Sequence, residues 1–98
     1  MKFEIELNKT ADLLTITLRG RLDTTTAPAL DEAIASSLDG VSALTIDCTD
    51  LAYVSSAGLR VLLSAQKKMK GSMKLTGVCE LVMEVFEMTG FSDIFVIE

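Results

Sequence analysis

The spacing of apolar residues changes repeatedly along this chain between a period of two and a period of about 3.6, and this constrains the fold more than any other feature. A period of two runs through residues 3–7 and again through residues 14–18, which predicts two strands that each have one face in water. Turn-forming residues 8–12 lie between them. We therefore predict that the chain opens with an antiparallel hairpin.

Helical spacing and short apolar runs alternate after the hairpin, and residues 49–56 are predicted to be a connection. A helix between two strands forms a right-handed crossover, which joins parallel strands. The sequence thus predicts an α/β domain, with a mixed sheet and helices packed mainly on one face. The helices are predicted over 27–38, 57–70 and 80–89, and the later strands over 42–48, 72–79 and 93–98.

Two further sets of apolar residues are predicted to fill the core. The methionines Met69, Met73, Met83 and Met88 recur at core spacing, which is typical of gap-filling side chains. The side chains of the last helix that are predicted to point inward are Leu81, Val82, Val85, Phe86 and Met88.

The composition excludes several classes of function. The chain of 98 residues is 49% apolar, which is enough for a packed core. Its net charge of −5 disfavours nonspecific binding to nucleic acid, which requires a basic face. It contains no histidine, which excludes a histidine-centred catalytic triad or zinc site. An acidic chain of this kind suits a basic protein partner.

The sequence also predicts a reduced, cytoplasmic protein. No apolar run approaches the ~20 residues of a membrane span, so we expect no membrane insertion. Residues 1–4 lack the apolar stretch of a signal peptide. The cysteines Cys48 and Cys79 lie in apolar stretches and form no CxxC pair, which is typical of buried thiols.

Polar residues follow two of the predicted strands. In open α/β sheets, binding sites lie beyond the carboxyl ends of the strands. The segments "LDTTT" and "SSAGLRVLL" both follow strands, so we expect their polar residues to share one edge. The candidate neighbourhood consists of Asp23, Asp47, Asp50, Ser55 and Ser56.

The adjacent serines Ser55 and Ser56 have two interpretations. A serine at a helix N-cap accepts a hydrogen bond from a free backbone N–H, and this explains one of them without any function. Alternatively, one hydroxyl is exposed and becomes phosphorylated. The added charge would then lie at the positive end of the helix, with little disturbance of the fold. Gly58 would allow close approach of the backbone or of a partner.

Other candidate sites carry weaker signals. Asp23 is interpreted either as the cap of a turn before the threonine run or as a polar contact beside the serines. The phosphate-binding motifs GxxxxGK[ST] and GxGxxG are absent. Asp47 and Asp50 are weak evidence for a magnesium site. Asp47 lies within a predicted strand, and Asp50 is more simply explained as a turn residue. We therefore expect no metal and no cofactor.

Three blocks occur in order: "GRLDTTTAPALDEAI", "LTIDCTDLAYVSSAGLRVLL" and "GSMKLTGVCELVMEVFEMTGFSDIF". Together they resemble a STAS domain of the bacterial anti-sigma factor antagonist family. The resemblance covers nearly the whole chain and implies one STAS domain over residues 1–98. It agrees with the architecture that the apolar spacing predicts.

The resemblance implies a partner-switching regulator that is not an enzyme. In such systems an anti-sigma factor, which is a serine kinase with a histidine-kinase-like ATPase fold, holds a sigma factor inactive. The unmodified antagonist binds this kinase and frees the sigma factor. Phosphorylation of one serine of the antagonist ends the complex, and a PP2C-type phosphatase restores it.

The resemblance also implies which residues act. The phosphorylated serine of the family lies two residues before the glycine at the helix start, which here is Ser56. Family members often carry Asp immediately before it, whereas this chain has Ser55 there, and Ser55 becomes a second candidate acceptor. Asp23 matches the "G-x-L-D" position that borders this surface. The expected partner-binding residues are Asp23, Thr24, Thr25, Ser55, Ser56, Ala57, Gly58 and Leu59.

Other members of the STAS superfamily suggest an alternative. The chain could act as a non-switching adaptor subunit of a membrane transport or stress-signalling complex, and its serines would then be simple helix caps. A purified pull-down distinguishes the two, because a kinase-fold partner indicates switching and a transporter subunit indicates an adaptor. No motif supports a third class, a nucleotide or small-molecule sensor.

Overall fold

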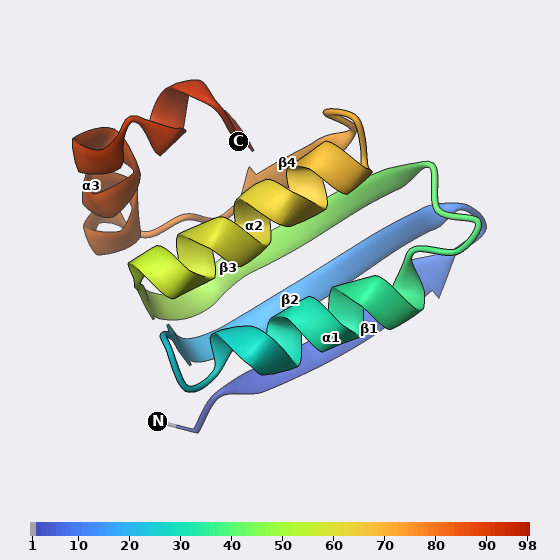
Figure 1. The fold of residues 1–98 in the computed structure, drawn as a ribbon, viewed down its shortest axis with the longest axis horizontal. Coiled ribbons are helices and arrows are strands. Elements are labelled where there is room, and N and C mark those ends of the chain that lie inside the picture. Colours follow the sequence, from blue (N-terminus) through green and yellow to red (C-terminus); the bar gives the residue numbers. More distant parts are fainter. Residues whose placement is uncertain (1) are drawn as a thin grey trace.

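The computed structural model describes residues 2–98 and contains the predicted hairpin, followed by crossovers (Figure 1). All five strands form one sheet in the order β1-β2-β3-β4-β5, in which β1 is antiparallel to β2 and the others are parallel to their neighbours. The elements are β1 (Glu4–Thr10), β2 (Leu13–Leu22), α1 (Ala27–Ser37), β3 (Ala43–Val54), α2 (Ser56–Lys68), β4 (Met73–Thr76), α3 (Glu80–Thr89), the 3-10 helix η1 (Phe91–Asp93) and β5 (Val96–Ile97).

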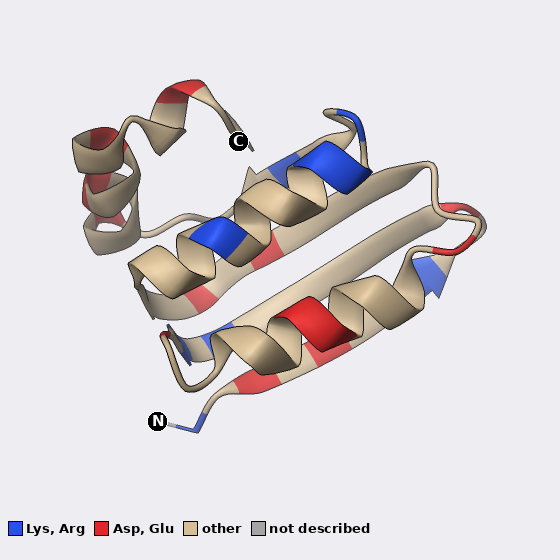
Figure 2. Ribbon diagram, viewed as in Figure 1, with Lys and Arg blue, Asp and Glu red and all other residues tan. Residues whose placement is uncertain are grey.

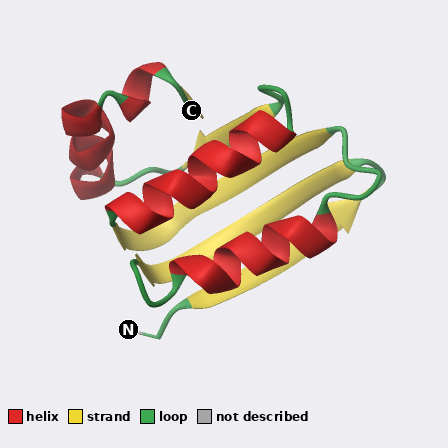
Figure 3. Cartoon of the chain, in the orientation of Figure 1, coloured by secondary structure: helices red, strands yellow, loops and turns green. Residues whose placement is uncertain are grey.

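The predicted α/β fold with a mixed sheet is confirmed. Each crossover leads to the next strand in the same direction across the sheet, so right-handed connections place the helices on the same side. Figure 3 shows α1 and α2 lying along one face of the sheet, where they also contact each other. It shows α3 beyond the end of the sheet rather than over its middle.

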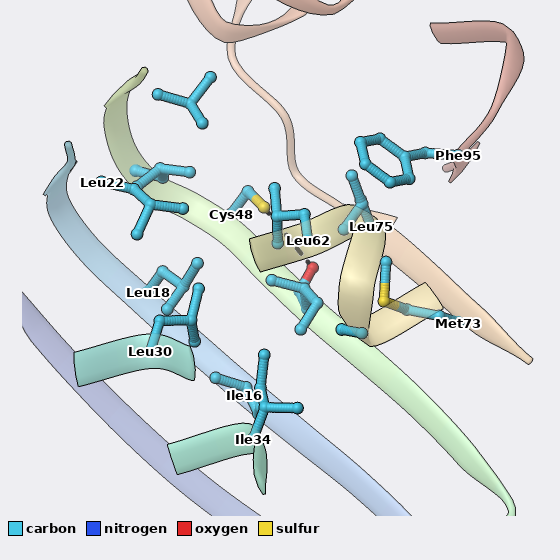
Figure 4. Packing of buried hydrophobic residues seen from close by; sticks show 14 of the residues in the cluster. Ile16, Leu18, Leu22, Leu30, Ile34, Cys48, Leu62, Met73, Leu75 and Phe95 are labelled. Carbon is cyan, nitrogen blue, oxygen red and sulfur yellow. Dashed lines mark hydrogen bonds between the residues drawn. The ribbon is translucent and has the colours of Figure 1, made fainter. Parts of the chain in front are cut away.

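The core lies between the sheet and these two helices. β2 alternates regularly, and its residues Ile16 and Leu18 are fully buried. Leu30 and Ile34 of α1 lie over them (Figure 4). Leu62 of α2 is buried in the same cluster. Each such side chain contributes about 1.5–3 kcal/mol by its removal from water.

The opposite face of the sheet is polar. Arg19 of β2 reaches across to β1, where its guanidinium lies 4.0 Å from Glu4 and 3.5 Å from Glu6. On its other side it lies 3.6 Å from Asp50 of β3. These groups are partly exposed, and exposed ion pairs each contribute little to stability. These charged side chains make this face of the sheet polar.

The prediction that residues 49–56 form a connection is wrong, because β3 continues to Val54. Its pairing with β2 shifts register twice, between Thr17 and Arg19 and again between Gly20 and Arg21. Such bulges insert unpaired residues and interrupt the alternation of apolar and polar side chains. The second half of β3 therefore shows no period of two in the sequence, although it remains paired with β2 in the structure.

Other boundaries are also corrected. β1 extends to Thr10, so the turn is shorter than residues 8–12. β4 ends at Thr76, and the predicted strand 72–79 is therefore too long at both ends. Gly77, with φ of +66°, begins the turn that leads into α3. The predicted strand 93–98 is reduced to two residues, because η1 occupies the chain just before it.

Candidate functional site

The site lies where the carboxyl ends of β2 and β3 lead into α1 and α2. Ser55 is the N-cap of α2, with the extended backbone angles typical of this position, φ −100° and ψ 175°. Its Oγ accepts a hydrogen bond from the backbone N–H of Gly58 at 3.4 Å, which is a long bond. The N-cap interpretation is therefore confirmed for Ser55.

Ser56 has a different environment. It is the first residue of α2 and is exposed. Within residues 2–98, its hydroxyl group makes no hydrogen bond to another side chain or to the backbone. Backbone N–H groups at the start of a helix lack intrahelical partners, and the helix dipole is positive there. A phosphate on Ser56 would be placed at this end of the helix without displacing any existing contact.

Gly58 holds the start of α2 against the end of β2. A Cβ atom at this position would lie 2.7 Å from Cγ and 3.0 Å from the carbonyl oxygen of Leu22. The backbone N–H of Ser55 donates to that same carbonyl oxygen at 2.9 Å. The close approach predicted for Gly58 is thus an approach to the chain's own backbone. It fixes the serines relative to the loop after β2.

Asp23 organises that loop. Its Oδ1 accepts hydrogen bonds from the hydroxyl of Thr25 at 2.7 Å and from the backbone N–H groups of Thr25 at 3.0 Å and Thr26 at 3.1 Å. The Thr25 hydroxyl is the largest cause of a lowered pKa at Asp23, and the two backbone N–H groups lower the pKa further. The turn-capping interpretation is confirmed. Thr26 is the N-cap residue of α1 but forms no side-chain cap.

The structure brings together only part of the predicted neighbourhood. Leu22 pairs with Val54, so Asp23 and Ser55 follow directly from neighbouring strand positions. Asp47 and Asp50 lie further back in β3, where Asp47 is half-buried and Asp50 is exposed, and they are not at this edge. Asp47 instead accepts hydrogen bonds from Thr49, which lower its pKa.

The comparisons with known proteins agree with this architecture. The family model described as STAS domain matches residues 4–98. BtrV of Bordetella bronchiseptica, a candidate anti-sigma factor antagonist, is 34% identical over 96 residues, which cover 94% of this chain and 83% of that protein. The anti-sigma-B factor antagonist of Listeria monocytogenes is 33% identical over 104 residues, covering 100% of this chain and 90% of that protein.

The solved structure of an anti-sigma factor antagonist from Mycobacterium paratuberculosis has the same fold. It superposes with a TM-score of 0.86 at 24% identity, covering 98% of this chain and 85% of that one. This chain belongs to the STAS-domain anti-sigma factor antagonist family. Members of this family are regulators and not enzymes.

Three residues near the site of this STAS domain were not predicted. Arg21 of β2 stacks on the ring of Tyr53 in β3, with its guanidinium carbon 4.2 Å from the ring centroid. Arg60 is exposed on α2, four residues after Ser56 and hence on the same side of the helix. Figure 2 shows basic residues near the start and at the end of α2. Helical spacing alone could have identified Arg60, whereas the Arg21–Tyr53 pair depends on strand register.

The potential metal ligands and the two cysteines complete the description of this part of the molecule. Among the described residues, no group of three or more His, Cys, Asp or Glu side chains could hold a metal ion. Cys48 is buried, and burial raises the pKa of its thiol to about 12. Cys79 is only half-buried, so its predicted burial is partly wrong. Its thiol donates to the carbonyl oxygen of Leu51 at 3.5 Å.

The structure also bears on membrane association. Within residues 2–98, no helix is long and apolar enough to cross a membrane.

Proposed function

We propose that this chain is an anti-sigma factor antagonist that works by partner switching. Its unphosphorylated form binds an anti-sigma factor, a serine kinase with a histidine-kinase-like ATPase fold, and thereby frees a sigma factor. Phosphorylation of Ser56 ends this binding. The observation that supports the proposal is the structural difference between the two serines: Ser55 caps α2, whereas Ser56 is exposed at the start of the helix.

A local physical mechanism supports the switch. A phosphate adds about −1.5 to −2 charges at neutral pH. At Ser56 this charge would be presented to a partner that docks over the start of α2, where it would replace a neutral hydroxyl. The fold itself would change little, because within residues 2–98 the Ser56 side chain makes no hydrogen bond that must be broken, and the helix dipole favours negative charge here. Phosphorylation would therefore weaken partner binding and leave the stability of the fold nearly unchanged.

The surrounding residues would form the binding surface. Asp23, Thr24 and Thr25 lie in the loop that the Leu22 carbonyl links to Ser55. Ala57, Gly58 and Leu59 form the first turn of α2, although Gly58 and Leu59 are buried and would act by positioning their neighbours. A PP2C-type phosphatase would remove the phosphate. Such a system operates in the cytoplasm, where we place this chain.

Mass spectrometry of the protein isolated from its own cells tests the proposal first. We expect a phosphate on Ser56 that a PP2C phosphatase removes. A phosphate on Ser55 would move the site, and the absence of phosphate from both serines across growth and stress conditions would contradict the mechanism.

Affinity capture with two variants supplies the second test. Ser56→Ala should retain a kinase-fold partner and block its release, because a neutral side chain remains where the phosphate would form. Ser56→Asp should capture much less of the same partner. Ser72→Asp, at an exposed serine that precedes β4 and lies outside the helices, is the control for added charge. Equal capture by all three variants, or capture of a transporter subunit, would favour the non-switching adaptor.

A further inference from the structure

The outer face of α3 carries a row of apolar side chains, of which Leu81 and Met88 are exposed and Val85 packs against the edge of the core. Leu81 is 52% exposed and Met88 is 86% exposed, and the half-buried Val85 lies between them. Their spacing of four and three residues places them on one side of the helix. Val82 and Phe86 are buried on the neighbouring side of the helix. The prediction that Leu81 and Met88 point inward, and that Met88 fills the core, is therefore wrong.

A row of carboxylates borders these apolar residues. Glu80, Glu84 and Glu87 have the same spacing, displaced by one residue, and all three are exposed. α3 contains no lysine or arginine, and Figure 2 shows acidic segments along it. We call Leu81, Val85 and Met88 the α3 strip. The strip thus has buried core on one side and negative charge on the other.

The α3 strip lies at the same end of the sheet as Ser56. β4 ends beside Asp47 of β3, and α3 packs against β3, which continues from there to Val54 and the start of α2 (Figure 1). α3 is anchored there by the Cys79 thiol, which donates to the carbonyl oxygen of Leu51. Leu51 precedes Ser55 by four residues, or about 13 Å along a strand.

One partner can therefore reach both features. A standard protein interface covers about 800 Å² on each partner, which is a patch roughly 30 Å across. The chain measures 33 × 29 × 19 Å, so a patch of this size spans most of one of its faces. The charge pattern disfavours an antiparallel two-fold contact between two copies through the strip, because the two rows of glutamates would then face each other.

We propose that the α3 strip is a second contact for the anti-sigma factor that binds at Ser56, and that this partner covers it with apolar side chains bordered by lysine or arginine. This inference rests on the proposed function. The two contacts would have different roles. The region around Ser56 senses phosphorylation, whereas the strip contributes affinity in both phosphorylation states, because its chemistry does not change when Ser56 is modified.

Photo-crosslinking in the organism's own cells tests the inference. The crosslinking amino acid p-benzoylphenylalanine replaces Met88, Arg60 or Asn8 in the full chain, one at a time. Arg60 reports on the Ser56 region, and Asn8 is an exposed control in β1. We expect positions 88 and 60 to form an adduct with the same protein, identified by mass spectrometry as a kinase-fold ATPase, and position 8 to form none.

The other outcomes separate the two proposals. An adduct from position 60 alone would overturn the second contact and leave the proposed function intact. Different proteins at positions 60 and 88, or the same protein at all three positions, would also overturn it. No adduct at position 60 under any condition would contradict the proposed function, and the inference would fall with it.

Binding by purified proteins then tests the chemistry. Met88→Lys should weaken binding of the crosslinked partner at least tenfold, because it removes an apolar contact and places a cation against a basic rim. Met88→Leu should restore most of the affinity, and circular dichroism should show both variants folded, since Met88 is exposed. Ser56→Asp should weaken binding by the same factor in the Met88→Lys background as in the wild type, because the two contacts act independently. Undiminished binding by Met88→Lys would overturn the inference.

Discussion

The backbone N–H of Ser55 donates to the carbonyl oxygen of Leu22 at 2.9 Å, and this single bond joins the two loops of the candidate site. It forms because β2 and β3 end in register, with Leu22 opposite Val54. The start of α2 is thereby held beside the loop that Asp23 organises. Both loops therefore lie at one edge of the fold, and under the proposed function a phosphate on Ser56 would be presented to a partner there.

Replacement of Gly58 by alanine should destabilise the protein. Alanine is normally the better helix residue, by about 1 kcal/mol. Here its Cβ would lie 2.7 Å from Cγ of Leu22, and overpacking of this kind costs about 1–3 kcal/mol. We expect a net loss of free energy of unfolding, measured by urea denaturation.

A double-mutant cycle identifies the cause of that loss. In the Gly58→Ala background, Leu22→Ala should cost less than it does in the wild type, because the smaller side chain relieves the clash. Equal costs in the two backgrounds would show that the Leu22 side chain is not responsible. An increase in stability for Gly58→Ala would contradict the packing described for this end of α2.

Removal of the N-cap should have a smaller effect. Ser55→Ala leaves one N–H of α2 without its side-chain acceptor, and loss of a cap typically costs about 1 kcal/mol. The bond to Gly58 is long, at 3.4 Å, so we expect a loss at or below that value. Ser56→Ala is the matched control and should change stability by no more than about 0.5 kcal/mol. Equal losses would mean that the two serines do not differ as described.

The order of elements and the crossover topology could be predicted from the sequence, because apolar spacing directly reflects which side of a strand or helix is buried. The bulged half of β3 could not, since its inserted residues break the period of two at Thr49 and Asp50. The outward face of α3 was missed for a different reason. Leu81 and Met88 are apolar like the core residues beside them, and periodicity does not distinguish two apolar sides of one helix.

The candidate site was predictable in position but not in detail. The strand-to-helix edge follows from topology, which placed Asp23 beside the serines. The roles of Ser55 and Ser56 depend on where the helix begins, and a shift of one residue would exchange them. Asp47 and Asp50 were placed at the edge because β3 was expected to end at Cys48. The strand runs six residues further, which leaves both acids in its interior.

The carboxylate of Asp23 should make stability depend on pH in the acid range. Hydrogen bonds from Thr25 and Thr26 lower its pKa from the ordinary value of 3.8. A carboxyl whose pKa is lowered by folding contributes stability that is fully present above its unfolded pKa and is lost as the pH falls through the folded pKa. Protonation of the Asp23 carboxylate removes its negative charge and so weakens the hydrogen bonds that it accepts within the loop.

Thermal unfolding of the Asp23→Asn variant measures this contribution. At neutral pH the wild type should have the higher Tm, and the difference should narrow as the pH falls below 3.8. The contribution is small because Asp23 is only half-buried, and water screens the interaction. Asp31→Asn, at an exposed position of α1, is the control. A difference in Tm that stays constant across the acid range would show that the charge of Asp23 plays no part.

A negative charge at Ser56 should be tolerated or should stabilise the free protein, even as it weakens partner binding. Ser56→Asp places a carboxylate at the positive end of α2 and four residues before Arg60. The interaction with the helix dipole is worth about 0.3–1 kcal/mol at low salt, and the ion pair with Arg60 about 0.2–0.5 kcal/mol. The Tm should therefore stay equal to or above that of the wild type at low ionic strength, and salt should remove any gain. Arg60→Ala in the same background should remove the part that depends on the ion pair. If Ser56→Asp instead unfolds the protein or lowers its Tm by several degrees, its loss of binding would reflect a damaged fold, and the charge switch at Ser56 would lose its physical basis.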